Sequence, residues 1–198
     1  MSEFKTNLSA AHDDSKTVFG FWVYLMTDCV LFASLFATFA VLRNNTFGGP
    51  GGADLFSLPF VLGETLLLLS SSFTIGLAVL AAQRGLKTQV LAWLGVTALL
   101  GAAFLTMELT EFTNLVREGN SWARSGFLSS FFTLVGTHGL HIATGLLWIT
   151  VMAAQVYRRG LGHATLRRLT LLSMFWHFLD LIWIFIFTIV YLMGAVQG

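Results

Sequence analysis

The chain has 198 residues, of which 56% are hydrophobic and only 11% are charged, and its formal net charge is +1 at pH 7. A soluble domain carries about 25% charged residues, so this composition excludes an ordinary soluble domain and favours a membrane protein. No basic cluster is large enough to indicate nucleic-acid binding, and a single cysteine, Cys29, excludes an internal disulfide.

Five long apolar stretches follow one another along the chain, over residues 18–42, 60–82, 90–116, 127–156 and 169–196. Each exceeds the roughly 20 residues that a helix needs to cross a hydrocarbon core. We therefore predict an all-α integral membrane bundle of five transmembrane helices. Residues 1–17 are polar and lack helical periodicity, so we expect a weakly ordered N-terminal tail followed by one membrane domain over residues 18–198.

Lysine and arginine are unevenly shared between the two predicted faces of the bundle. One face carries eight of them: Lys5, Lys16, Arg84, Lys87, Arg158, Arg159, Arg167 and Arg168. The opposite face carries three: Arg43, Arg117 and Arg124. Cytoplasmic loops carry the excess of positive charge, so we predict a cytoplasmic N-terminus and a C-terminus outside.

The first predicted span holds Asp28 near its middle, about 15 Å from the cytoplasmic end at a rise of about 1.5 Å per residue. A charge near the bilayer centre costs at least about 2.5–3.5 kcal/mol. Two interpretations remain open. Asp28 joins helices through hydrogen bonds, or it faces a lipid headgroup or a water-filled cleft.

A glycine-rich turn at residues 47–52 separates the first span from the second, where Pro59 suits the first turn of a helix. No predicted span has a proline in its interior, which favours a static bundle over a transporter with broken helices. Glu64 lies early in the second span, and we interpret it chiefly as a hydrogen-bonding residue between helices.

Glu108 and Glu111 form an acidic pair toward the outer end of the third span, where their spacing of three places them on one helix face. We expect this outer-side acidic pair to be solvated or to face another subunit, rather than to carry chemistry.

The fourth and fifth spans each hold a polar pair near the middle, His138 with His141 and His177 with Asp180. We predict that these four side chains and Asp28 occupy one layer and share hydrogen bonds as an intramembrane polar network. Trp176, Trp183 and Tyr191 flank the fifth span's pair, and we interpret them as ordinary lipid-facing and interhelical packing residues.

Histidines on adjacent helices, such as His141 and His177, can bracket a haem. Each histidine here belongs to a pair spaced one turn apart rather than several turns, and no Glu precedes a His by three residues, as carboxylate-bridged metal sites prefer. We therefore predict no catalytic residue, metal ligand or cofactor in this chain. A small membrane cytochrome with two histidine ligands and a proton-coupled transporter remain as alternatives.

Four segments resemble the subunit III family of the haem–copper oxidases. The most specific are Thr137-His-Gly-Leu-His-Ile142 in the fourth span and Phe175-Trp-His-Phe-Leu-Asp180, followed by Trp183, in the fifth. Met26-Thr-Asp-Cys29 and Met107-Glu-Leu-Thr-Glu-Phe112 support them. The resemblance covers almost everything from residue 19 to residue 194. Longer members have seven spans, whereas five spans are typical of the bacterial quinol-oxidising branch.

This resemblance implies a non-catalytic subunit of a proton-pumping ubiquinol oxidase in the bacterial inner membrane, with a cytochrome c oxidase as the alternative. It implies haem and copper in a partner subunit I, further contact with subunit II and a small subunit IV, and bound phospholipid. The family's carboxyl residue matches Asp28, and its lipid-contacting histidine matches His141, so both are expected to bind lipid or to support a proton path.

Overall fold

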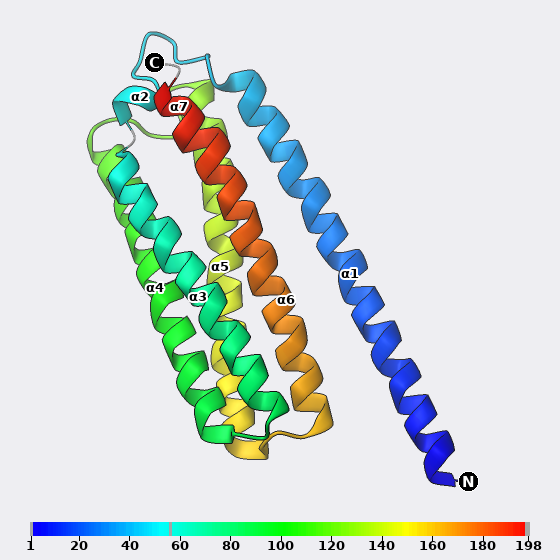
Figure 1. Ribbon diagram of the computed structural model, residues 1–198. Helices are drawn as coiled ribbons and strands as arrows, with labels where there is room; N and C mark the ends of the chain where they lie inside the picture. The colour runs from blue at the N-terminus through cyan, green and yellow to red at the C-terminus, as the bar shows by residue number, and fades with distance from the viewer. Residues whose placement is uncertain (1, 56, 197–198) are drawn as a thin grey trace.

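The computed structural model describes residues 2–55 and 57–196, and it is helical nearly throughout (Figure 1). Five helices are long and apolar enough to cross a membrane, which confirms the predicted fold class. The elements in chain order are α1 (Ser2–Leu42), α2 (Gly52–Leu55), α3 (Leu58–Gln83), α4 (Lys87–Arg117), α5 (Gly126–Arg159), α6 (His163–Ile186), the π-helix η1 (Phe187–Leu192) and α7 (Met193–Val196).

Helices α3, α4, α5 and α6 form the body of the molecule, in which α3 packs on α4 and α6, and α5 packs on α4 and α6. Helix α1 lies outside this ring against α5 and α6, and Figure 1 shows it diverging from the ring toward its N-terminus. We call the end of the bundle with α2 and α7 the C-terminal end, and the end with the α3–α4 and α5–α6 turns the N-terminal end.

Helix α1 begins at Ser2 and therefore continues through the segment in which the sequence indicated a tail without regular structure. Residues 2–18 contain neither glycine nor proline. A helix that is already nucleated in the membrane span extends at little cost through such a segment. The division of the chain into a tail and a membrane domain remains a prediction.

Local sequence explains most helix boundaries. Pro59 stands in the first turn of α3, as predicted, and Ser125 caps α5 by accepting a hydrogen bond from the Leu128 N–H at 3.2 Å. Gly160 ends α5 with φ of 72° and ψ of −167°, a conformation that is essentially restricted to glycine. Helix α6 begins at His163, six residues before the predicted span, because only Gly160, Leu161 and Gly162 are needed for the turn.

One tryptophan occupies the centre of the four-helix ring. Trp176 on α6 is fully buried, and its indole N–H donates to the Ser71 hydroxyl of α3 at 2.9 Å. A Cβ atom added at Gly101 of α4 or at Gly145 of α5 would lie 2.8 Å from the indole ring. The two glycines therefore create the space in which the ring contacts three neighbouring helices.

A second tryptophan repeats this arrangement one heptad later. Trp183 is also fully buried, and its indole N–H donates to the Thr65 hydroxyl of α3 at 3.1 Å. Its ring meets the Phe104 ring of α4 edge-on, with centroids 4.6 Å apart. Both tryptophans pack between helices in the interior and do not face lipid, and they also supply polar bonds between helices.

Candidate functional site

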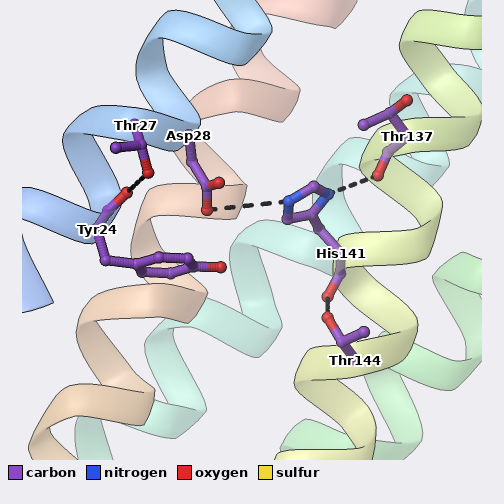
Figure 2. A network of polar contacts seen from close by, with 6 residues as sticks. All are labelled: Tyr24, Thr27, Asp28, Thr137, His141 and Thr144. Atoms are coloured by element: carbon purple, nitrogen blue, oxygen red, sulfur yellow. Dashed lines mark hydrogen bonds and ion pairs between the residues drawn. The ribbon is translucent and has the colours of Figure 1, made fainter.

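Asp28 of α1 and His141 of α5 face each other near the middle of the bundle (Figure 2). The Asp28 Oδ2 atom lies 3.9 Å from the His141 Nε2 atom. The Nδ1 atom of His141 is 2.7 Å from the Thr137 carbonyl oxygen, one turn earlier on α5. A carbonyl only accepts hydrogen bonds, so this contact assigns the proton to Nδ1 and turns Nε2 toward the carboxyl group.

The same geometry limits the hydrogen bonds that this pair could form. With Nδ1 protonated, a neutral imidazole presents a lone pair to Asp28, and an ionised carboxylate would then face that lone pair without a shared hydrogen. The contact is attractive when one more proton resides on Nε2 or on the carboxyl group. Asp28 is buried, and its Oδ2 atom has no hydrogen bond within the described part of the chain.

Neighbouring side chains enclose this pair. The Tyr24 hydroxyl lies beside the Asp28 carboxyl group, one turn away on α1 (Figure 2). The buried Phe32 ring lies 5.2 Å from the His141 ring, measured between centroids. Asp28 and His141 therefore supply a polar link between α1 and the rest of the bundle, surrounded by aromatic side chains.

The other members of the predicted polar network do not join this pair directly. His138 is fully buried, neither of its ring nitrogens is hydrogen-bonded to another described residue, and its imidazole stacks on Trp183 at 5.3 Å. His177 is exposed on the surface of α6. Asp180 is buried, and it interacts with His177 electrostatically, with no direct hydrogen bond between the two. These side chains occur at similar depths, but they project from their helices in different directions and so do not meet.

The acidic pair lies toward the Arg117 end of α4, but it is more buried than the sequence indicated. Glu108 is only 2% exposed, so the expectation of a solvated residue is wrong for it. Its carboxyl group lies against Gly139 of α5, where an added Cβ would come within 2.5 Å of Oε1. Glu111 is half-buried and accepts a hydrogen bond from the Tyr191 hydroxyl of η1 at 2.8 Å.

Glu64 of α3 belongs to the same group of acids. It is fully buried, neither of its carboxyl oxygens is hydrogen-bonded within the described residues, and it interacts electrostatically with Glu108 and Glu111. We call Glu64, Glu108 and Glu111, together with Tyr191, the acid cluster. The hydrogen bond from Tyr191 to Glu111 could not be predicted from the sequence, because nothing near Tyr191 in the chain indicates a partner 80 residues earlier.

The sequence did contain a signal for the burial of Glu108. Buried residues of α4 follow one another at alternating steps of four and three residues from Val90 through Leu94, Thr97, Gly101 and Phe104 to Glu108, and Leu115 lies seven residues further on. Such a repeat marks one face of a helix. Glu108 lies on that face, so the periodicity of the apolar residues predicts a buried position for it more reliably than its depth does.

A groove opens at the N-terminal end of the bundle between α1, α3 and α6, with a volume of about 330 Å³. Its apolar wall includes Val18, Val79 and Leu169, and its polar lining includes Gln83, His163, Arg167 and Thr170. This groove could not be predicted from the sequence, because its residues come from three helices that are distant in the chain.

Metal and haem ligands are not suggested by this arrangement. Within the described residues, no three His, Cys, Asp or Glu side chains are grouped closely enough to hold a metal ion. The His138 ring is enclosed by Phe104 and Trp183, while His177 is exposed on α6. His138 and His177 therefore do not bracket one common space, as two axial ligands of a haem would.

Comparisons with known proteins agree with the resemblance seen in the sequence. The family model for cytochrome c oxidase subunit III matches residues 7–195. The cytochrome bo(3) ubiquinol oxidase subunit 3 of Pseudomonas aeruginosa is 62% identical over 186 residues, which cover 93% of this chain and 89% of that protein.

Two further relatives extend the comparison. The protein of the same name from Pseudomonas putida is 55% identical over 185 residues, covering 93% of this chain and 89% of the relative. The cytochrome c oxidase subunit 3 of Bacillus sp. (strain PS3) is 46% identical over 177 residues, covering 89% and 86%. From the family match over nearly its whole length and from these identities, the chain belongs to the cytochrome c oxidase subunit III family.

Proposed function

We propose that this chain is the non-catalytic subunit III of a proton-pumping terminal oxidase that takes electrons from ubiquinol and reduces dioxygen to water. The observation that carries the proposal is its 62% identity, over 93% of the chain, to a protein named as subunit 3 of a ubiquinol oxidase.

The partners and location belong to the same proposal. Subunit I carries the haem and copper, subunit II and a small subunit IV complete the complex, and the chain lies in the bacterial inner membrane. The cation-rich loops, including Arg84, Lys87, Arg158 and Arg159, lie at the N-terminal end of the bundle. The positive-inside bias then places this end in the cytoplasm and the acid cluster on the outer side.

Two features support the lipid-binding part of the proposal. Asp28 and His141 present polar atoms at mid-depth where α1 meets α5, and they are proposed to contact lipid or to support a proton path in subunit I. The groove at the N-terminal end combines an apolar wall with His163 and Arg167. A phospholipid, with an acyl chain and an anionic headgroup, has the complementary chemistry.

Purification of the assembled complex tests the assignment of the electron donor. The chain is tagged, extracted in a mild detergent, and its bound subunits and haem types are identified. We expect a complex that oxidises ubiquinol and leaves reduced cytochrome c unchanged. Oxidation of cytochrome c alone would transfer the assignment to the cytochrome c branch, to which the relative from Bacillus sp. (strain PS3) belongs by name. A haem spectrum that stays with the isolated chain would overturn the non-catalytic role.

Substitution of Asp28 tests the proposed supporting role. We expect Asp28→Ala to assemble with a full haem content, but to retain less lipid and to inactivate sooner during turnover, because α1 loses its polar link to His141. Val30→Ala is the matched control, since Val30 is also on α1 and is 71% exposed. If the lipid content and turnover lifetime of both variants equal those of the parent, Asp28 has only a packing role.

A further inference from the structure

The acid cluster at the C-terminal end of the bundle is not explained by a supporting role. It combines three carboxyl groups from two helices, Glu64 of α3 and Glu108 and Glu111 of α4, with a tyrosine of η1. Glu64 is fully buried and interacts electrostatically with the other two acids, and neither of its oxygens is hydrogen-bonded within the described residues. An apolar side chain in place of Glu64 would fill this site without leaving a buried polar group that lacks a hydrogen-bond partner.

The groups that face the cluster do not neutralise three negative charges. The electrostatic influences on Glu64 come from Glu111 and Glu108, and the one on Glu108 comes from Glu111. Helix α5 faces the cluster with Gly139, beside His138, whose ring is enclosed by Phe104 and Trp183. The π-helix contributes the Tyr191 hydroxyl, which donates to Glu111. Carboxylates that lack cationic partners repel one another and lose hydration when buried together.

Two backbone features lie beside the acid cluster, Gly139 of α5 and the π-helix η1. A side chain at Gly139 would lie too close to the Glu108 carboxyl group. The glycine therefore lets the backbone of α5 pack directly against this carboxyl group. The helix widens to a π-helix over Phe187–Leu192, and Tyr191 within it is fully buried with its hydroxyl on Glu111. Single π-turns inside α-helices occur frequently at functional sites.

We infer that the acid cluster is a proton-binding site, which holds its carboxyl groups mainly as neutral acids and exchanges a proton at the C-terminal end of the bundle. Glu111 is only half-buried, and it is the member through which the proton leaves to water. The proton passes from a carboxyl oxygen to a water molecule or buffer base, and one negative charge remains on the cluster. The hydrogen bond from Tyr191 stabilises that charge on Glu111.

A proton is the ligand that fits this geometry. The three acids interact electrostatically, but they are not grouped closely enough to coordinate one metal ion. The inference goes beyond the proposed supporting role, because it assigns to this chain a reversible chemical event of its own. It does not depend on whether ubiquinol or cytochrome c is the electron donor.

Infrared spectroscopy of the whole purified complex tests this site directly. The C=O stretch of a protonated carboxyl group is separate from the carboxylate bands and shifts when H₂O is replaced by D₂O. We expect the spectrum of the parent minus that of Glu108→Gln, and likewise minus that of Glu64→Gln, to contain such a band near neutral pH. The band should decrease as the pH of the medium is raised. Glu118→Gln is the matched control, because Glu118 is exposed just after α4, and its subtraction should show no protonated carboxyl band.

The outcomes separate this site from a merely structural group of acids. Neutral glutamine replaces a neutral acid with little change in volume, so both buried variants should assemble at the parent's yield. Difference spectra that contain carboxylate bands alone would overturn the inference. Failure of both Glu64→Gln and Glu108→Gln to assemble would also overturn it, because that result would mean that ionised carboxylates are needed at these positions.

Discussion

Gly101→Ala is the substitution for which the structure sets the clearest expectation. An added Cβ would lie 2.8 and 2.9 Å from two ring carbons of Trp176, and 3.1 Å from a methyl carbon of Leu146. The indole is rigid, fully buried and hydrogen-bonded to Ser71, so it has no free space into which to move. Gly101→Ala therefore overpacks the centre of the bundle.

The size of the effect follows from two opposing contributions. Overpacking a close-packed interior costs about 1–3 kcal/mol, whereas replacing glycine by alanine within a helix gains about 1 kcal/mol. Gly95→Ala is the control, because Gly95 also lies within α4 and an added Cβ there meets no atom within 4 Å. Gly101→Ala should thus be less stable than Gly95→Ala by about 1–3 kcal/mol, and by about 1 kcal/mol more if Trp176 loses its bond to Ser71.

The assay measures the temperature at which this chain is lost from the purified complex. For a chain of this size, each kcal/mol corresponds to a shift of about 2–4 °C. We expect Gly95→Ala to equal or exceed the parent, and Gly101→Ala to fall several degrees below Gly95→Ala. Equal transition temperatures for the two variants would show that Trp176 is not confined by Gly101, and would refute the packing argument.

Three other substitutions test separate parts of the structure. Gly160→Ala should lower the same transition temperature, because the φ of 72° and ψ of −167° at this position cost a residue with a side chain about 1–3 kcal/mol. Gly162→Ala is the control, because Gly162 has a φ of −84° that any residue adopts. Equal transition temperatures for the two variants would contradict the expected backbone strain at residue 160. Tyr191→Phe removes the donor to Glu111, so it should destabilise the chain by about 1 kcal/mol in that assay; an unchanged transition temperature would count against the bond. His177→Leu should leave the yield and the turnover per complex unchanged, because His177 is exposed and has no hydrogen bond within the described residues; a reduced yield would indicate a contact with a partner subunit.

The number and kind of the main helices could be predicted from the sequence, because span length and apolar content are local properties. The first turn of α3 is similarly local, since Pro59 favours it through its own backbone geometry. The spacing of the buried α4 residues around Glu108 also predicts that this residue is buried. These features depend on neighbours in the chain rather than on contacts between distant segments.

The pairing of polar side chains could not be predicted in the same way. Depth alone placed Asp28, His138, His141, His177 and Asp180 in one layer, but the rotation of each helix decides which of them meet. Of these five side chains, Asp28 and His141 form an ion pair between helices in the described structure, while His177 is exposed. The π-helix that contains Tyr191 depends on the same long-range packing, since its hydroxyl binds a residue 80 positions away.

The two tryptophan bonds from α6 to α3 have a consequence for biosynthesis. Both indole N–H groups bind hydroxyls on a helix that enters the membrane more than 100 residues earlier. A slide of one residue, about 1.5 Å along the axis, would misalign both bonds at once, so the two helices can dock in a single axial register. A nascent chain that ends before the last helix lacks both bonds, so the axial position of α3 becomes fixed only after α6 has been synthesised.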